Sequence, residues 1–404
     1  MPGGADDLAR LELLRSPRGQ DVLGELAQLA VTPDTALRVG TELRRRYPAG
    51  LVAAAVAQHE LRLQARAKFS RAMQMYFTRP GLEQASAEVV ARHRAARYSP
   101  FGRVADLCCG IGGDLLALAQ AIPAPGGPAQ GRHVLAVDRD PLHLRMAEAN
   151  AGVYGAARAV TAVASDVRDA GLAGMDAVFI DPARRAGQRR MATGESEPPL
   201  RWCLDLAGQV AAVGIKAAPG LARDAVPDGW ELEFVAVGRE LKEATAWSPA
   251  LATAVRRASV LPEGHTLTSR PGPPVPVAAP GAFLLDPSPA VTRAGLVEEL
   301  ARMLGAWKID EQIAFLSSDV PASTPFGRTL RVIDSAPWNQ KQLAGRLRGL
   351  DIGAADIRRR GLAGDVDQLH RSLKLSGTRR ATIVMTRVRD RPWGLICVDD
   401  GPIS

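Results

Sequence analysis

VADLCCGIGGDLLAL, which runs from Val104 to Leu118, indicates a buried strand, a glycine-rich turn and the start of a helix. The first residues are apolar and suit a strand, and Gly110, Gly112 and Gly113 allow a tight turn. A strand, turn and helix in this order point helix amides at a ligand near the carboxyl end of the strand. The stretch therefore predicts an α/β fold that binds a nucleotide-like ligand at this turn.

The spacing of the glycines differs from the dinucleotide-binding fingerprint, which needs glycines at the first, third and sixth positions. Gly110 and Gly112 occupy the first two of these positions, but Leu115 stands at the sixth, and Asp106 precedes the turn. This D-x-x-x-G-x-G-G pattern resembles motif I of the class I S-adenosylmethionine-dependent methyltransferases. The resemblance implies that Asp106, Gly110 and Gly112, together with Asp114, contact S-adenosylmethionine. An ordinary strand–helix corner in another α/β protein is the alternative at this point.

Acidic residues also end the next three predicted strands, at Asp138, Asp166 and Asp181. Ligands bind at the carboxyl ends of strands in open parallel sheets. A carboxylate after the second strand suits a ribose diol because it accepts two hydroxyl hydrogen bonds, so Asp138 is the candidate for that contact. Asp166, in ASDV, resembles the motif III acid near the adenine amino group. Each of these residues could instead cap a helix, but three in succession favour a doubly wound, Rossmann-like class I methyltransferase core.

The fourth predicted strand ends in AVFIDPARRAG, where Asp181 and Pro182 resemble motif IV, the D/N-P-P-aromatic signature of amino-group methyltransferases. Ala183 and Arg184 depart from that signature, which weakens the case for an exocyclic amine and leaves oxygen methylation open. We interpret Asp181, Pro182 and Lys216, at the end of the fifth strand, as the catalytic set. Asp181 would orient an amine, and Lys216 would hold a phosphate or a developing charge.

The same stretch also resembles the D-P-P-R-x-G of uracil-C5 RNA methyltransferases. Those enzymes need a cysteine nucleophile after the fifth strand. Here that position reads IKAAPG, and Cys203 lies before the strand, so a covalent C5 mechanism is disfavoured.

Apolar spacing and proline content divide the chain into four predicted parts. Residues 1–100 are expected to form helices, including one over 83–98 whose arginines either face solvent or contact RNA. Residues 101–262 are the methyltransferase core. Five prolines in 263–282 indicate a linker without a regular element. Residues 283–404 form an α+β module with a helix expected over 292–305.

Nearly the whole chain resembles a bacterial family of S-adenosylmethionine-dependent methyltransferases that end in a THUMP-like domain. The resemblance rests on EQASAEVVARHRAAR, DLCCGIGGD, AVDRDP, IDPARR, GRELKEA and RRRGLAGDVDQLHRSLKLSG. THUMP domains present RNA to a partner enzyme domain, so the resemblance implies a tRNA or rRNA substrate. Residues 341–391 hold thirteen Lys/Arg and five Asp/Glu, a surplus equal to the whole-chain net charge of +8. The candidate RNA-binding residues are Arg184, Arg185, Arg358, Arg359, Arg360, Arg379 and Arg380.

The composition limits the other possibilities. The four cysteines have no metal-ligand spacing, so no metal site is expected. No apolar stretch is long enough for a membrane span, and no signal pattern is visible, so a cytoplasmic protein is expected. Two other functions stay open: a small-molecule methyltransferase, and an RNA-binding protein whose methyltransferase fold is inactive. The sequence leaves the oligomeric state open.

Overall fold

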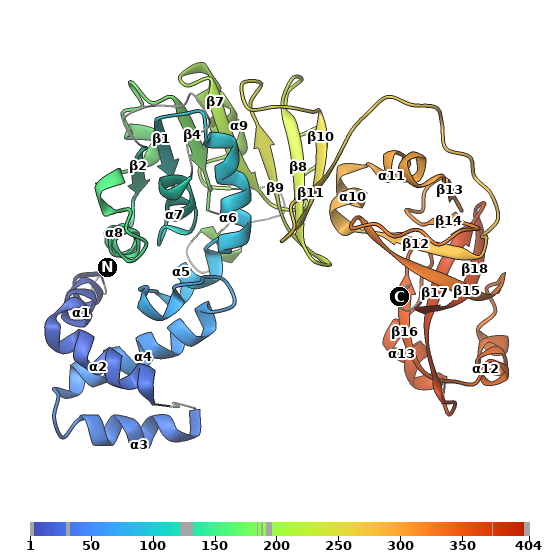
Figure 1. The fold of residues 1–404 in the computed structure, drawn as a ribbon, viewed down its shortest axis with the longest axis horizontal. Coiled ribbons are helices and arrows are strands. Elements are labelled where there is room, and N and C mark those ends of the chain that lie inside the picture. The colour runs from blue at the N-terminus through green and yellow to red at the C-terminus, as the bar shows by residue number, and fades with distance from the viewer. Residues whose placement is uncertain are drawn as a thin grey trace. The chain divides into compact units, whose positions relative to one another are not determined.

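The computed structural model describes residues 4–29, 33–121, 132–183, 185–186, 189–190, 196–373 and 375–399 (Figure 1). The chain divides into two compact units. The first holds Met1–Trp230 and Thr245–Ala252, and the second holds Glu231–Ala244 and Thr253–Ser404.

The first unit begins with helices. They are α1 (Gly4–Arg15), α2 (Pro17–Gln28), α3 (Pro33–Leu43), α4 (Ala49–Ala65), α5 (Arg79–Gln84) and α6 (Glu88–Ala95), with 3-10 turns at Ala72–Gln74 and Ala96–Tyr98. The helix expected over 83–98 is wrong in its extent. Thr78 caps the start of α5, because its side chain accepts a hydrogen bond from the amide of Gly81. After α5 the backbone is extended at Ala85 and Ala87, and α6 starts only then.

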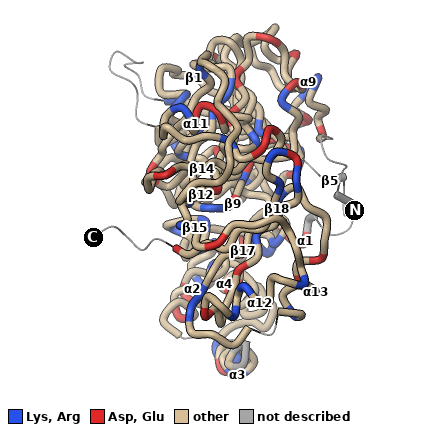
Figure 2. The backbone as a smooth tube through the Cα atoms, turned by 90° about the vertical axis from the view of Figure 1, so that its right-hand side faces the viewer, with Lys and Arg blue, Asp and Glu red and all other residues tan. Residues whose placement is uncertain are grey.

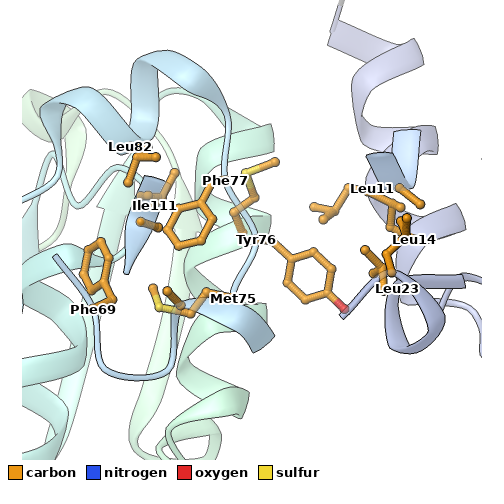
Figure 3. Close-up of a cluster of buried hydrophobic side chains, with 14 of the residues drawn as sticks. Leu11, Leu14, Leu23, Phe69, Met75, Tyr76, Phe77, Leu82 and Ile111 are labelled. Carbon is orange, nitrogen blue, oxygen red and sulfur yellow. The ribbon is translucent and has the colours of Figure 1, made fainter. Parts of the chain in front are cut away.

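The N-terminal helices share a hydrophobic core with the glycine turn. Figure 3 shows Ile111, which belongs to that turn, among Phe77 and Leu82, with Leu11 and Leu14 of α1 in the same cluster. A Cβ on Gly81 would lie 2.6 Å from Cγ2 of Ile111, so α5 packs directly on the turn. The helices are therefore part of the structure that supports the turn.

Five parallel strands of the first unit follow the order β7-β4-β1-β2-β3. They are β1 (Arg103–Leu107), β2 (His133–Asp138), β3 (Val160–Ala164), β4 (Ala177–Ile180) and β7 (Ala212–Ala217). The helices between them are α7 (Gly113–Gln120), α8 (Pro141–Val153) and α9 (Leu200–Asp205), and the short strands β5 (Arg185–Ala186) and β6 (Arg189–Arg190) form a separate pair. The strand order reverses between β1 and β4, which is the switch point where open α/β sheets bind ligands. The Rossmann-like class I fold is confirmed.

The second unit starts with β8 (Glu231–Val237), and the chain passes back into the first unit within β9 (Glu240–Trp247). β10 (Arg256–Leu261) runs parallel to β8 and pairs antiparallel with β11 (His265–Thr268). The expectation that 263–282 holds no regular element is therefore wrong. Gly264 takes a positive φ of +80°, and this turn lets the chain form β11 before the first proline of the stretch.

A seven-stranded sheet follows, in the order β13-β14-β12-β15-β18-β17-β16. Its strands are β12 (Phe283–Pro287), β13 (Trp307–Lys308), β14 (Leu316–Ser318), β15 (Gly327–Pro337), β16 (Ile352–Arg359), β17 (Arg379–Val388) and β18 (Arg391–Asp399). Its helices are α10 (Pro289–Ala294), α11 (Val297–Leu304), α12 (Gln340–Gly349) and α13 (Val366–Ser372). The single helix expected over 292–305 is wrong, because left-handed Gly295 ends α10 and a second helix begins.

Candidate active site

The glycine turn after β1 has a left-handed backbone at three positions. Cys108 has φ +58°, Gly110 φ +54° and Gly112 φ +94°. A Cβ on Gly110 would meet no atom within 4 Å, so the turn leaves open space on that side. A Cβ on Gly112 would lie 3.3 Å from Ala147 of α8, which explains a glycine there by close packing as well as by φ.

A cavity of about 530 Å³ opens at the carboxyl ends of β1, β2, β4 and β7. It brings together nearly all of the predicted cofactor and catalytic residues. From that set it is lined by Asp106, Gly110, Asp114, Asp138, Asp181, Pro182 and Lys216. A smaller cavity of about 70 Å³ is lined by Asp166 and also by Asp138 and Cys108, which both cavities share.

Asp106, the last residue but one of β1, is the most unusual group in the cavity wall. It is fully buried, and neither carboxylate oxygen has a hydrogen-bond partner in the described part of the chain. Burial raises the pKa of Asp106 well above its usual range, and the nearby carboxylates of Asp114 and Asp181 raise it further. A ligand in the cavity could therefore supply the hydrogen-bond donor or the positive charge that this carboxylate lacks.

Asp138 ends β2 and organises the turn. Its Oδ2 accepts a hydrogen bond from the amide of Gly110 at 2.8 Å, and its Oδ1 accepts one from the amide of Asp140 at 2.9 Å. Each carboxylate oxygen can accept a second hydrogen bond, so Asp138 keeps acceptor capacity toward both cavities. Asp166 accepts a hydrogen bond from the amide of Arg168 at 2.9 Å and pairs with that guanidinium at 3.1 Å.

Asp114, in the first turn of α7, has protein partners on both oxygens. Nε of buried Arg94 donates to Oδ1 at 3.1 Å, and Oγ of Ser86 donates to Oδ2 at 2.8 Å. Burial alone would raise the pKa of Asp114, but Arg94 and Lys216 lower it below the usual value. The Asp114 carboxylate is thus a charged member of a protein network at the cavity wall.

The same network reaches Asp181. Nζ of Lys216 donates to Oδ2 of Asp181 at 2.6 Å and to Oγ of Ser86 at 2.9 Å, so it bridges β4 to the segment before α6. Burial raises the pKa of Asp181, although Lys216 opposes that effect. The backbone amide of Asp181 donates to Leu107 O at 3.2 Å, which fixes the strand end beside β1, and Pro182 is buried next to it.

Sequence reasoning missed Ser86 and Arg94 as members of this site. Arg94 is only 1% exposed and lies over the ring of Phe179 at 5.1 Å, so neither reading of the arginines in 83–98 describes it. Arg92, by contrast, is exposed and pairs with Glu88 on the same helix. One signal was available: Arg94 shares its helix face with buried Val90 and Ala91, and a face of that kind points inward.

The predicted RNA-binding arginines do not line the cavity in the described part of the chain. Arg184 lies outside the described residues, and only the backbone of Arg185 is described, in β5. The other five lie in the second unit. Their partners are Asp286 for Arg358 and Arg360, Gly364 O for Arg359, Leu350 O for Arg379 and Asp356 for Arg380.

The four cysteines are free thiols, and three of them are buried. Burial raises the pKa of Cys203 to about 12 and that of Cys108 still higher. The described residues contain no cluster of three or more His, Cys, Asp or Glu placed to hold a metal ion. Within those same residues, no helix is both long and apolar enough to cross a membrane.

Three families match parts of the chain. Residues 101–193 match the family described as RNA cap guanine-N2 methyltransferase, and residues 327–398 match the one described as THUMP domain-like. Residues 7–65 match a domain family of unknown function, DUF8688.

Relatives cover a larger share of the chain. Two proteins of Mycobacterium tuberculosis, from strains CDC 1551 / Oshkosh and ATCC 25618 / H37Rv, are each 37% identical to it over 330 residues. Both are described as uncharacterized S-adenosylmethionine-dependent methyltransferases, and the match covers 78% of this chain and 85% of each relative. A crystal structure from Porphyromonas gingivalis W83, described as a methyltransferase, covers 94% of this chain and 98% of that one. Its TM-score is 0.73 at 19% identity, a likeness that shows the fold.

Proposed function

Because the chain belongs to the S-adenosylmethionine-dependent methyltransferases, in their class I form with a C-terminal THUMP-like domain, we propose that it methylates a base of RNA. The cofactor is S-adenosylmethionine. The RNA substrate and the roles of the individual residues are the proposal.

The first cavity fits this cofactor. Gly110 leaves open space at the turn, and the unpartnered carboxylate of Asp106 suits a cationic ligand. Asp138 keeps acceptor capacity for a vicinal diol, and Asp166 lines the adjoining cavity, where an adenine amino group would find an acceptor. Bound S-adenosylmethionine supplies an electrophilic methyl group, so the protein needs mainly to align the acceptor and remove a proton.

Asp181 is the residue that we assign to the acceptor. Lys216 holds its Oδ2, which leaves Oδ1 to accept a hydrogen bond from an amine and direct the nitrogen lone pair. Lys216 is itself held by Ser86, so the carboxylate has a fixed orientation. A carbon target is disfavoured, because Cys203 is buried with a pKa near 12 and no cysteine follows β7 within the first unit. Nitrogen is the preferred target and oxygen the second.

The observation that carries the RNA assignment is the combination of this cavity with a basic C-terminal module in one chain. Residues 341–391 hold a surplus of eight positive charges, interspersed with acidic positions along the trace (Figure 2). Two matched families, one named for RNA cap guanine-N2 methylation and one for THUMP, support the same substrate class. Phosphate contacts by such a module would be largely independent of sequence and sensitive to salt.

The test is nucleoside mass spectrometry of total RNA from a deletion strain and its parent. We expect one methylated nucleoside to be lost in the deletion strain and restored in vitro by the purified chain with S-adenosylmethionine. An RNA profile identical to the parent, with turnover on small molecules, would favour a small-molecule methyltransferase. RNA binding without any turnover would favour an inactive methyltransferase fold.

A further inference from the structure

Three arginines of the second unit converge on one carboxylate. Asp286, in β12, lies 3.2 Å from Nη2 of Arg360, 3.8 Å from Nη2 of Arg239 and 3.9 Å from Nε of Arg358. Arg239 comes from the turn between β8 and β9, whereas Arg358 lies near the end of β16 and Arg360 directly follows that strand. We call these four residues the Asp286 cluster.

The cluster has more positive than negative charge. One carboxylate faces three guanidinium groups, and the neighbouring Arg328 is already paired with Asp399. Partial burial and the charges of Arg358 and Arg328 lower the pKa of Arg239. An unfavourable arrangement of like charges of this kind is relieved when an anion binds among them.

Two guanidiniums of the cluster keep donors for a ligand. Arg239 and Arg358 approach Asp286 only at 3.8–3.9 Å, beyond hydrogen-bond range, and their side chains are 55% and 47% exposed. Arg360 is more constrained, because it donates to Ala314 O at 2.7 Å and lies over the ring of Phe315. Arg360 therefore lies nearest to the carboxylate, whereas Arg239 and Arg358 are farther from it and about half exposed.

The arginines on β17 lack this arrangement. Arg380 pairs with Asp356 at 2.8 Å, one charge against one. Arg379 donates to the backbone oxygen of Leu350 at 3.3 Å instead of pairing with several charged groups. Basic residues are thus not equivalent across this module: Arg380 is balanced by one aspartate, whereas three arginines share Asp286.

We propose that the Asp286 cluster binds a phosphate group of the RNA backbone, with Arg239 and Arg358 as its donors. This inference rests on the proposed function and narrows it to one contact point. Guanidinium groups match the oxygens of a phosphate with paired N–H donors, and two of them can share one phosphodiester. Arg239 joins the site from outside the matched THUMP-like segment, residues 327–398.

The experiment measures RNA affinity of the full chain against salt concentration. The probe is a fluorescently labelled pool of tRNA and rRNA fragments, and the variant is Arg239→Gln with Arg358→Gln. The slope of log affinity against log salt should fall by about 1, since the two arginines share one phosphate and each lost phosphate contact removes about 1. The matched variant, Arg379→Gln with Arg380→Gln, removes the same charge from the same module and should change the slope much less. Thermal unfolding checks that both variants fold.

A charge-keeping variant, Arg239→Lys with Arg358→Lys, should retain most of the slope and lose part of the affinity, because lysine cannot form the paired contact. Equal slopes for the two glutamine variants would overturn the cluster as a site, while RNA methylation by the wild-type chain would leave the proposed function standing. If the wild-type chain bound no RNA at low salt, both proposals would fall. Competition by inorganic phosphate at micromolar concentration would instead assign the cluster to a free anion and overturn the RNA contact.

Discussion

The large cavity of the first unit, which we propose as the cofactor site, and the Asp286 cluster of the second unit are opposite in charge. In the cavity, Asp106 is a buried carboxylate without a partner, and further acids surround it. In the cluster, Asp286 is a single carboxylate facing an excess of guanidinium groups. Each imbalance is unfavourable in the free protein and would be relieved by the ligand proposed for it, a sulfonium compound in one case and a phosphate in the other.

The ion pair of Arg94 and Asp114 is an example of balanced charges in the same molecule. Arg94 and Asp114 are both buried, and each satisfies the other with help from Ser86. We expect this pair to stabilise the fold, even though Asp114 lines the cavity and was predicted to contact the cofactor. Residue types alone therefore do not distinguish a ligand site from a structural pair, whereas the local balance of charges and hydrogen bonds does.

The largest expected effect separates Asp181, the proposed catalytic acid, from the acids that we propose bind the cofactor. Asp181→Asn keeps the shape and an acceptor oxygen but removes the charge that Lys216 balances. We expect methyl transfer to slow by roughly 10²–10⁴-fold while S-adenosylmethionine binding stays close to wild type. Single-turnover kinetics and calorimetry measure the two quantities. A variant with nearly normal turnover would reduce Asp181 to a residue that shapes the turn.

The next effect tests the balanced pair. Arg94→Gln leaves the carboxylate of Asp114 buried without its charge partner, and we expect unfolding free energy to fall by about 3–5 kcal/mol. Arg92→Gln, on the same helix but exposed, is the control and should cost less than about 1 kcal/mol. Chemical denaturation measures both. A similar small loss in the two variants would mean that the buried pair is not structural.

The pH dependence of the wild type adds to this test. The pKa of Asp114 is lowered in the folded chain, so its stabilising contribution is fully present above the usual aspartate pKa. That contribution is lost as pH falls through the folded value. In Arg94→Gln, the unfolding free energy should therefore depend much less on pH between about pH 2 and 5 than it does in the wild type. A series of denaturation curves over that pH range measures this difference.

Asp106→Asn should act in opposite directions on stability and binding. The raised pKa means that the folded chain favours the protonated form, so ionised Asp106 lowers stability as pH rises above the usual aspartate pKa. The asparagine side chain carries no charge, so we expect the unfolding free energy of the free chain to rise by about 1–3 kcal/mol at neutral pH. Cofactor binding should weaken by a similar amount. Thermal unfolding with and without S-adenosylmethionine measures both changes. Destabilisation of the free chain would contradict the unpaired carboxylate.

The smallest expected effect concerns Asp138, whose oxygens already have protein donors. Asp138→Ala removes acceptors for the ribose diol and for the amide of Gly110, and should weaken S-adenosylmethionine binding by about 1–3 kcal/mol. Asp138→Asn retains one acceptor oxygen and should fall between the alanine variant and the wild type. Calorimetry distinguishes the three proteins, and equal affinities would remove Asp138 from the cofactor site.

The class I core could be predicted because its signals are local. A glycine turn after an apolar strand and acids at strand ends are visible within short stretches, and parallel strands bring their carboxyl ends to one edge of the sheet. This explains why Asp106, Asp138 and Asp181 were found together with Lys216. Asp166, one strand further out, lines the adjoining cavity instead.

The contacts that join distant segments could not be predicted in the same way. Arg94 and Asp114 belong to different helices, and a one-dimensional pattern gives no sign that they form an ion pair. Arg239 was missed because it lies in a two-residue turn between β8 and β9, far in the sequence from Asp286, Arg358 and Arg360. Gly295 and Gly264 altered element boundaries through left-handed conformations that many glycines do not adopt.

The shared core of the N-terminal helices and the glycine turn has a consequence for protein engineering. Ile111 is buried against Phe77 and Leu82, one residue after Gly110 at the mouth of the cavity (Figure 3). The N-terminal segment also supports the polar side chains of the cavity, because Ser86 accepts a hydrogen bond from Lys216 and Arg94 donates one to Asp114. A minimal catalytic fragment cut at the first strand would therefore expose an apolar side chain within its own cofactor turn. Anyone shortening or transplanting this enzyme should carry the segment from Phe69 onward with the sheet, as one inseparable part.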